Sequence, residues 1–390
     1  MEYKRIEELT SVVTGGTPST SKVEYWDDGD IPWLQSGCCQ NCDVYEAEKY
    51  ITQIGYDNSS TRMMPVDTVM IALTGATAGK IGYLNFEACG NQSITGILPC
   101  DELNQRYLYF YLISQRNKIL ADCIGGAQPH ISQGYVKNMR VPVPTKEEQQ
   151  SIVEKLKGLT VIISQRQKEI ELLDDLIKAR FVEMFGDPKT NDKGFTKAPM
   201  GEYMTLLTDF SSNGSYKTLD SGVTMYDEPN YAWMVRTTDL ESGDMSSIKY
   251  IDEKAYELLS KSKIFGGEII MNKIGSAGKV YLMPEIDMPA SLGRNAFMFR
   301  YDDRINVRFL FEQLVSEYGQ AEIQQYVRGA VTKTITKDDA RSVLIIVPEK
   351  ELQDEFVKFV KQVDKSKVAV QKVLDETQLL FDSLMQEYFG

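Results

Sequence analysis

An internal repeat constrains the fold of this chain more than any other feature, because its two halves match at an offset near 200 residues that settles at 204. The matched segments run in the same order in both halves, so each half holds a globular segment, a proline-marked junction and a long helix. The matches pair Pro32-Trp33-Leu34 with Ala232-Trp233-Met234, Ala78-Gly79-Lys80-Ile81 with Ala277-Gly278-Lys279-Val280, Val143-Pro144 with Val347-Pro348, and Glu183-Met-Phe-Gly186 with Glu387-Tyr-Phe-Gly390. Asn91-Gln92-Ser93 falls near Arg294-Asn295-Ala296. We therefore expect a complete two-unit design.

The end of each half carries a heptad pattern, with apolar residues at alternating steps of four and three. This pattern favours a coiled coil over an amphipathic helix packed on its own domain, and about 50 Å of such a rod would hold two globular heads at a fixed separation. The polar exceptions fall at different positions in the two helices, so a pairing between the helices would place each of them opposite an apolar residue. The seam comprises Ile152, Leu156, Leu159, Ile163, Arg166, Ile170, Leu173, Ile177, Arg180 and Met184, then Phe356, Val360, Val363, Lys367, Val370, Leu374, Thr377, Phe381, Leu384 and Tyr388.

The globular segments have the pattern of an α/β fold, because short β-rich runs bounded by Gly, Asn and Pro precede a helical stretch in each half. We predict two globular α/β domains separated by two long helices that form an antiparallel coiled coil. The predicted segments are residues 1–144 and 187–348 for the globular domains, and 145–186 and 349–390 for the helical regions.

The composition argues against secretion and membrane insertion. The N-terminus has no apolar stretch typical of a signal peptide, and no apolar run is long enough to span a membrane, so we expect a cytoplasmic protein. The net charge is −13, and none of the four segments is basic. Any affinity for DNA must then rest on local clusters of positive charge, since counterion release depends on the phosphates that are actually contacted. The acidity by itself weighs slightly against DNA binding.

No segment carries a convincing catalytic or metal-binding pattern. Cys39-x-x-Cys42 together with Cys89 or Cys100 lacks the second close-spaced pair of a zinc site, which favours free thiols. Gly75-Ala-Thr-Ala-Gly79-Lys80-Ile81 has three residues between its glycines, where a phosphate-binding Walker A loop needs four and then Ser or Thr after the lysine. His130 is the only histidine, so a catalytic or metal site based on histidine is not shared by the two heads.

Two divergent α/β heads alternating with two similar heptad helices resemble the specificity subunit of Type I restriction–modification systems. Three local motifs share this resemblance: Gly15-Gly16-Thr17-Pro18, Gly125-Gly126-Ala127-Gln128-Pro129-His130-Ile131-Ser132, and Val141-Pro142-Val143-Pro144 followed by Glu147-Glu148-Gln149-Gln150-x-Ile152-Val153. The resemblance covers essentially the whole chain. The second head departs from it, with Ser211-Ser212-Asn213-Gly214 and Gly329-Ala330-Val331-Thr332-Lys333-Thr334-Ile335-Thr336 in place of the first two motifs.

The resemblance implies a DNA reader without catalytic activity. Each head would recognise one part of a bipartite, asymmetric double-stranded DNA target, and the helices would set the gap between the parts. The helices would also dock two adenine-methylating modification subunits, and ATP-dependent restriction subunits can then join. S-adenosylmethionine and ATP would bind those partners, so we expect no cofactor, no metal and no catalytic residue in this chain.

Base reading requires paired donors or an acceptor–donor edge, which Arg offers to guanine and Asn or Gln to adenine. Loop residues of these types, with Ser, Thr and Lys, are the candidate DNA-binding set. In the first head they are Thr17, Ser19, Gln35, Ser36, Thr74, Thr77, Lys80, Asn91, Gln92, Gln128 and Ser132; in the second they are Arg236, Thr237, Asn272, Lys273, Ser276, Lys279, Arg294, Asn295, Lys333 and Thr336. Asn91 and Asn295 are equally suited to stabilise turns, and Lys80 and Lys279 are suited to contact phosphates or simply to be solvated. The arginines of the second head (Arg236, Arg294, Arg328) favour guanine in its part of the target.

Two other functions are compatible with a repeat of this kind. A coiled-coil adaptor would bind proteins with its heads and never touch DNA, and the acidic charge favours it slightly. Divergent heads on similar helices favour varied DNA targets instead. An enzyme with two catalytic domains would need a repeated catalytic constellation, whereas the repeated residues are mostly Gly, Pro, Trp and Lys.

Overall fold

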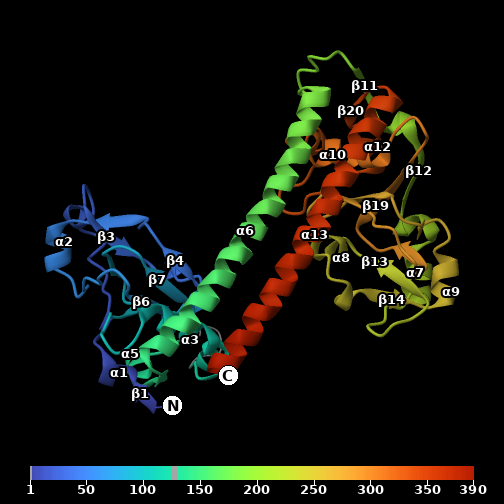
Figure 1. Ribbon diagram of the computed structural model, residues 1–390. Coiled ribbons are helices and arrows are strands. Elements are labelled where there is room, and N and C mark those ends of the chain that lie inside the picture. Colours follow the sequence, from blue (N-terminus) through green and yellow to red (C-terminus); the bar gives the residue numbers. More distant parts are fainter. Residues whose placement is uncertain (1, 124–129) are drawn as a thin grey trace. The chain divides into compact units, whose positions relative to one another are not determined.

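The computed structural model describes residues 2–123 and 130–390 and divides into two compact units (Figure 1). The first unit comprises Met1–Lys168 and Gln371–Gly390, and the second comprises Glu169–Val370. Two 40-residue helices, α6 (Lys146–Phe185) and α13 (Lys350–Phe389), contribute to both units. Each unit therefore combines one globular head with a stretch of each long helix.

The first head contains a two-stranded, a five-stranded and a three-stranded sheet, with the orders β1-β10, β2-β9-β6-β7-β4 and β5-β3-β8. Its strands are β1 (Glu2–Arg5), β2 (Val12–Thr14), β3 (Ile31–Leu34), β4 (Cys42–Val44), β5 (Lys49–Ile51), β6 (Val69–Ala72), β7 (Ile81–Leu84), β8 (Cys89–Gly90), β9 (Ile94–Ile97) and β10 (Arg140–Val143). Its helices are α1 (Ile6–Leu9), α2 (Gln53–Asp57), α3 (Gln105–Ser114), α4 (Arg116–Ala121) and α5 (Gln133–Asn138), with 3-10 turns η1 (Val23–Tyr25), η2 (Ser36–Cys38) and η3 (Gly75–Thr77).

The second head contains one two-stranded and two four-stranded sheets, with the orders β11-β20, β12-β19-β16-β17 and β14-β13-β18-β15. Its strands are β11 (Thr196–Pro199), β12 (Met204–Asp209), β13 (Ala232–Val235), β14 (Lys249–Ile251), β15 (Lys263–Ile264), β16 (Ile269–Asn272), β17 (Val280–Leu282), β18 (Ala290–Leu292), β19 (Ala296–Tyr301) and β20 (Leu344–Val347). Its helices are α7 (Tyr216–Gly222), α8 (Thr237–Ser242), α9 (Glu253–Leu258), α10 (Val307–Val315), α11 (Glu317–Gln324) and α12 (Lys337–Ser342), with 3-10 turns η4 (Met200–Tyr203), η5 (Phe210–Asn213) and η6 (Met245–Ser247).

The repeat in the sequence is a repeat of topology. The order β2-β9-β6-β7 in the first head is the order β12-β19-β16-β17 in the second, and β5-β3-β8 is repeated as β14-β13-β18. In both heads the third of these strands pairs parallel with the second, as Trp33 with Cys89 and Trp233 with Ala290. The heads differ at the sheet edges, where the first head adds β4 to β7 and the second adds β15 to β18. The predicted α/β fold with an internal repeat is confirmed.

The two long helices run antiparallel within the second unit. Asp174 of α6 accepts a hydrogen bond from Lys367 of α13 at 2.5 Å, while Arg180, six residues further along α6, pairs with Glu355 at 3.4 Å. As the residue numbers rise along α6, the numbers of their partners in α13 fall, which defines an antiparallel pair. The polar seam residues Arg180 and Lys367 each pair with a carboxylate of the opposite helix. The Arg180 guanidinium also lies 5.7 Å from the Phe359 ring.

Aromatic residues join these helices to the heads. In the second unit Phe181 and Phe185 of α6 pack on Phe356 of α13 and on Phe309 of α10, with ring centroids 4.8–5.8 Å apart. In the first unit Phe389 of α13 packs against α3 of the first head in the same manner. Offset and edge-on ring packing of this kind stabilises beyond the burial of area alone.

A buried glutamine fastens each long helix to its head, and it explains why Gln149 recurs as Gln353 at the repeat offset of 204. Gln353 is fully buried; its Oε1 accepts from the backbone N–H of Asn306 at 2.8 Å, and its Nε2 donates to the carbonyls of Arg304 and Pro348. Gln149 makes the corresponding three bonds with Asn104, Glu102 and Pro144 in the first unit. A glutamine is required here because only an amide offers both an acceptor and two donors at this position.

Candidate nucleic-acid interface

In the first head the candidate residues gather where five loops meet. These loops follow β2 and β3, connect β6 to β7 and β8 to β9, and precede α5. Backbone bonds tie them together: Asn91 N–H donates to Leu34 at 2.9 Å, Leu73 N–H to Ser93 at 2.8 Å, and Ile131 N–H to Leu73 at 2.9 Å. We call this set of loops the loop edge of the first head.

The second head repeats the same loop edge with equivalent bonds. Gly293 N–H donates to Val235 at 2.8 Å, Lys273 N–H to Asn295 at 2.9 Å, and Ile335 N–H to Lys273 at 3.1 Å. The backbone scaffold is therefore shared by the two heads, whereas the side chains it presents differ.

A glycine turn at each loop edge presents a lysine. Gly79 and Gly278 both have positive φ (73° and 88°), and a Cβ there would approach the side chains of Ile119 and Ile323 to 3.0 and 2.5 Å. In both heads this turn joins two antiparallel strands, whereas a Walker A loop leads into a helix. The turn therefore lacks the strand-to-helix geometry of a Walker A loop, and it is followed by a lysine in both heads.

The two turn lysines have different partners. Lys80 Nζ donates to the Gln40 side-chain oxygen at 2.5 Å, and Lys279 Nζ to Glu241 Oε1 at 2.6 Å. The Lys279 and Glu241 side chains are about half exposed, at 48% and 53%. The charge of Lys80 is consequently not neutralised by its partner, whereas that of Lys279 is.

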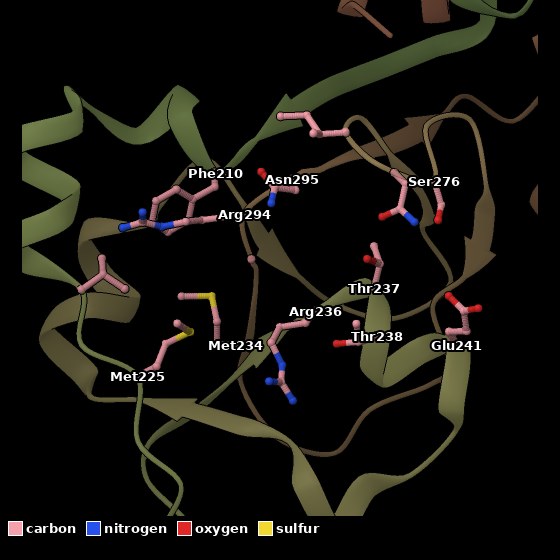
Figure 2. A pocket seen from close by; sticks show the side chains of 14 residues that line it. Phe210, Met225, Met234, Arg236, Thr237, Thr238, Glu241, Ser276, Arg294 and Asn295 are labelled. Carbon is pink, nitrogen blue, oxygen red and sulfur yellow. The ribbon is translucent and has the colours of Figure 1, made fainter. Parts of the chain in front are cut away.

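A cavity of about 400 Å³ opens at the loop edge of the second head (Figure 2). A neighbouring cavity of about 560 Å³ shares Ser276 with it and is lined by Lys279 and Lys333. Apolar side chains, among them Phe210, Met225 and Met234, form part of the first cavity. The sequence-predicted residues that line it are Arg236, Thr237, Asn272, Ser276, Arg294 and Asn295.

Arg294 and Asn295 present exposed polar groups at this cavity. The Arg294 guanidinium lies 5.2 Å from the Phe210 ring and makes a 3.3 Å bond to Asp220, and its side chain is 46% exposed. Asn295 is exposed and has a φ of 68°, the left-handed conformation that Asn tolerates. Asn295 therefore adopts a turn conformation while its side chain stays exposed.

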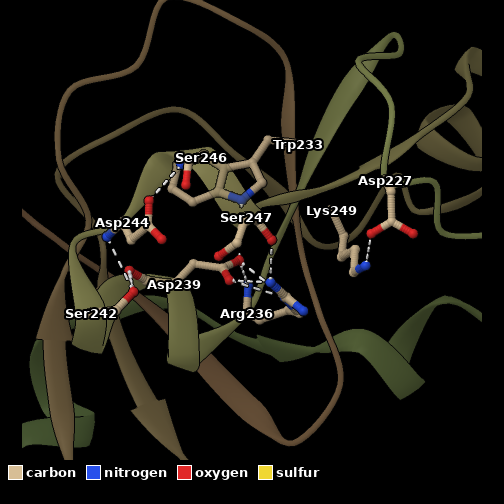
Figure 3. A network of polar contacts seen from close by, with 9 residues as sticks. All are labelled: Asp227, Trp233, Arg236, Asp239, Ser242, Asp244, Ser246, Ser247 and Lys249. Carbon is tan, nitrogen blue, oxygen red and sulfur yellow. Dashed lines mark hydrogen bonds and ion pairs between the residues drawn. The ribbon is translucent and has the colours of Figure 1, made fainter. Parts of the chain in front are cut away.

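Arg236 is engaged within the head (Figure 3). Its guanidinium binds Asp239 at 2.5 and 3.0 Å and donates to the Ser247 carbonyl at 2.8 Å. Asp239 is only 2% exposed and also accepts from the backbone N–H of Arg236 and from the Trp233 indole N–H. In Figure 2 the guanidinium points away from Asn295. Most of its donors are therefore used by the fold itself.

Lys273 is likewise held inside the second head. Its ammonium and that of Lys337 each lie 2.8 Å from a carboxylate oxygen of Asp209, which is 5% exposed. Burial raises the pKa of Asp209, but the hydrogen bonds from both lysines, Ser211 and Ser212 outweigh it and hold the pKa well below its ordinary value. This ion cluster lies at the end of β12, next to the loop that stands in place of the Gly-Gly-Thr-Pro of the first head.

Thr336 and Asn272 also have structural partners. Thr336 is the N-cap of α12, accepting from Asp339 N–H at 3.1 Å and donating to its carboxylate at 2.7 Å. Asn272 is 6% exposed and donates to the Tyr281 hydroxyl at 3.3 Å. Both residues lie beside the loop edge with their polar atoms at least partly used.

The side chains of the first loop edge make few, mostly local bonds. Thr17 Oγ1 donates to Gln92 Oε1 at 2.5 Å, and Asn91 Oδ1 accepts from the N–H of Ser93 at 3.1 Å, which stabilises the turn. Ser19 bonds Ser21 at 2.9 Å.

The other candidates of the first head differ in exposure. Gln35 is exposed and Ser36 is half-buried at the start of η2. Thr77 donates to the Thr74 carbonyl at 3.4 Å, and Thr74 forms a single β-bridge with His130. Gln128 lies outside the described residues.

Several residues that matter at the loop edges were missed by sequence reasoning. Gln40, Glu241, Asp209, Asp239 and Phe210 orient or neutralise the predicted cations. Only a capping-box spacing, three residues from Arg236 to Asp239, gave a local signal in the sequence. The other contacts join segments that are 38 to 84 residues apart.

The described part of the chain contains no group of three or more His, Cys, Asp and Glu residues that could hold a metal ion. All six cysteines are free thiols, and Cys39 and Cys89 are buried. Across residues 2–123 and 130–390, no helix is both long and apolar enough to cross a membrane.

The family model described as the Type I restriction modification DNA specificity domain matches residues 1–172 and 202–377. The MjaIX specificity subunit of Methanocaldococcus jannaschii is 23% identical over 398 residues, which cover 98% of this chain and 91% of the relative. The EcoR124I/EcoR124II specificity subunit of Escherichia coli is 30% identical over 193 residues, and this match spans only 48% of the relative and 45% of this chain. The crystal structure of the S subunit of a Type I restriction–modification system from M. genitalium matches with a TM-score of 0.60 at 16% identity, covering 100% of this chain and 96% of that one. The structural match concerns the fold alone.

Proposed function

Because this chain belongs to the Type I restriction–modification DNA specificity family, whose members recognise DNA targets, we propose that it reads a bipartite, asymmetric double-stranded DNA sequence, one part with each head. One observation carries this proposal: the two loop edges share a backbone scaffold and differ in their side chains. A common scaffold places both edges on a duplex in the same way, while different side chains select different bases.

Local positive charge supports DNA contact in this acidic chain. Among the described residues, no carboxylate pairs with Lys80 at the first edge or with Lys333 at the second, and Lys279 has only an exposed one. Exposed ion pairs are weak, so a phosphate oxygen can replace Glu241 as the partner of Lys279. A few such contacts suffice, because each neutralised phosphate releases condensed counterions.

The long helices are proposed to set the gap between the two parts of the target. Insertion of seven residues into both helices, after Lys168 and after Val370, keeps the heptad register and lengthens the rod by about 10 Å. At a rise of about 3.4 Å per base pair, the gap in the target is expected to grow by about three base pairs. An unchanged gap in a complex that still methylates DNA would show that the helices do not measure it.

The helices are also proposed to dock two adenine methyltransferase subunits, to which ATP-dependent restriction subunits can be added. Several large apolar side chains are exposed on them, including Leu172 (55%) and Leu176 (46%) on α6 and Leu379 (72%) on α13. Exposed apolar side chains in such numbers mark protein-binding surfaces.

We propose that S-adenosylmethionine and ATP bind only to these partner subunits. We also propose that this chain is not itself a catalyst and that the assembly works in the cytoplasm.

The test is to co-express the chain with an adenine methyltransferase subunit and to map the methylated adenines of the host genome by single-molecule sequencing. A single bipartite motif with a fixed, unspecified gap, lost when this chain is deleted, would support the proposal. Absence of such a motif, with the methyltransferase active and bound, would favour a coiled-coil adaptor without DNA binding. Salt-dependent DNA binding of the assembled complex separates these two functions independently.

A further inference from the structure

The turn between β8 and β9 and the turn between β18 and β19 correspond residue by residue. In both heads the N–H of the first turn residue donates to the carbonyl of the last residue of the neighbouring strand, β3 or β13. The carbonyl of the third turn residue accepts from the N–H of the residue that follows β6 or β16. These bonds equate Asn91–Ser93 with Gly293–Asn295. Gln92 and Arg294 therefore occupy the same place at the two loop edges, one residue away from the match suggested by the sequence alone.

The surroundings of Gln92 and Arg294 also correspond. Gln92 is bonded by Thr17 at 2.5 Å, and Arg294 lies over Phe210 at 5.2 Å; Thr17 and Phe210 each belong to the loop that follows β2 or β12. Both side chains are exposed and braced from one side. A braced side chain loses less conformational entropy on binding, which favours its use in recognition.

The remaining polar atoms match the edges of two different bases. The Gln92 amide nitrogen has no protein partner among the described residues, and its oxygen has a second lone pair, so the amide offers the donor and acceptor that adenine N7 and N6 require. One guanidinium nitrogen of Arg294 donates a 3.3 Å hydrogen bond to the exposed carboxylate of Asp220. The remaining N–H groups are donors that guanine O6 and N7 can accept. Arg236, in contrast, is occupied by Asp239.

We propose that Gln92 and Arg294 are paired specificity-determining residues, with Gln92 selecting adenine and Arg294 selecting guanine at corresponding positions of the two parts of the target. This inference rests on the proposed function. It predicts that each part contains one base pair whose identity depends on a single side chain. It also predicts that exchange of the two residue types exchanges the bases.

The test uses the full chain assembled with its methyltransferase, in the variants Gln92→Arg and Arg294→Gln. Methylated genomes give the target motif, and competition binding with randomised duplexes gives the preference at each position. Arg294→Gln is expected to lose about 10- to 100-fold of guanine preference at one position of one part and to leave the other part unchanged. Gln92→Arg is expected to replace adenine by guanine at one position of the other part. The untouched part is an internal control in each case.

Arg341→Gln serves as the matched control for lost charge. Arg341 is exposed, and within the described part of the chain its side chain bonds only the helix neighbour Asp338. It is expected to leave the motif intact. Thermal melting checks the fold of every variant.

A wild-type bipartite motif that both variants leave unchanged would overturn the inference. A uniform loss of affinity across all sequences, with a smaller salt dependence, would also overturn it, because this is the signature of a phosphate contact. If the wild-type complex gives no bipartite motif at all, the proposed function fails first, and that result is distinguished from the failure of these two residues alone.

Discussion

Glu241→Gln in the second head is expected to tighten DNA binding by freeing Lys279. Glu241 holds this lysine at 2.6 Å, and its pKa is lowered by the hydrogen bonds from Lys279 and Tyr281. A carboxyl with a lowered pKa keeps its charge, and hence its pairing, until the pH falls through the lowered value. Glu241 is therefore ionised at neutral pH and competes with DNA phosphates for the lysine.

The size of the effect follows from the exposure of the pair. Both side chains are about half exposed, so the ion pair is weak and its removal is expected to improve affinity by roughly two- to fivefold at physiological salt.

The opposite change, Gln40→Glu, would give Lys80 the same kind of partner and is expected to weaken binding by a similar factor. Lys80→Gln or Lys279→Gln each removes one phosphate contact and lowers the slope of log affinity against log salt by about 0.9.

The assay is equilibrium DNA binding of the assembled complex between about 50 and 200 mM salt, followed by fluorescence anisotropy. The Glu241→Gln gain is expected to be the same at pH 6 and pH 8, since the carboxylate is ionised at both. Equal affinities of Glu241→Gln and wild type at every salt concentration, together with an unchanged slope for Lys279→Gln, would refute the assignment of this lysine to a phosphate.

Three further predictions concern the scaffold and its partner. Gln353→Ala strands three buried hydrogen-bonding groups and is expected to lower the free energy of unfolding by about 3 kcal/mol in urea titrations, whereas the exposed Gln371→Ala is expected to change it little; equal effects would contradict the anchoring role. Asp209→Asn leaves two lysines unpaired and is expected to cost roughly 2–3 kcal/mol, equally at pH 6 and pH 8 because the pairing is lost only as pH falls toward the lowered pKa; a difference that changes between these pH values would contradict it. Leu172→Asp is expected to block assembly with the methyltransferase in size-exclusion chromatography without lowering the melting temperature, and a variant that still assembles would remove this face from the interface.

The helices could be predicted from the sequence because their information is local. The seam from Ile152 to Met184 lies within α6, and its copy from Phe356 to Tyr388 lies within α13. Sheet order could not be predicted, because it depends on contacts between distant segments, such as the parallel pairing of β4 with β7 across about 40 residues. Gln149 and its repeat Gln353 were visible in the sequence, but their role in anchoring the long helices became clear only from bonds such as the three that Gln353 makes.

The candidate site was predictable in outline for a similar reason. Loop position selected residues that line one cavity in the second head, because loops of its two four-stranded sheets meet there. Choice by residue type alone overlooked internal partners, and Arg236, Lys273 and Thr336 proved to bind Asp239, Asp209 and Asp339. A carboxylate that neutralises a predicted DNA contact carries no mark in the sequence when it comes from a distant loop.

These internal carboxylates also bear on the contradiction between an acidic chain and a DNA target. Asp209 and Asp239 are buried and paired with lysine or arginine, and these cations are counted in the formal charge of −13 as well. The two clusters therefore contribute no net negative charge to that total, and their carboxylates do not repel a phosphate at the surface. Charges elsewhere on the surface are screened within about 8 Å at physiological salt. The charge that acts on a phosphate at a loop edge is then set by Lys80 on the first head, and by Lys333 and the exchangeable Lys279–Glu241 pair on the second. Weak attraction of this kind would limit binding to arbitrary DNA, and the proposed base contacts at the two loop edges would then determine which target is preferred.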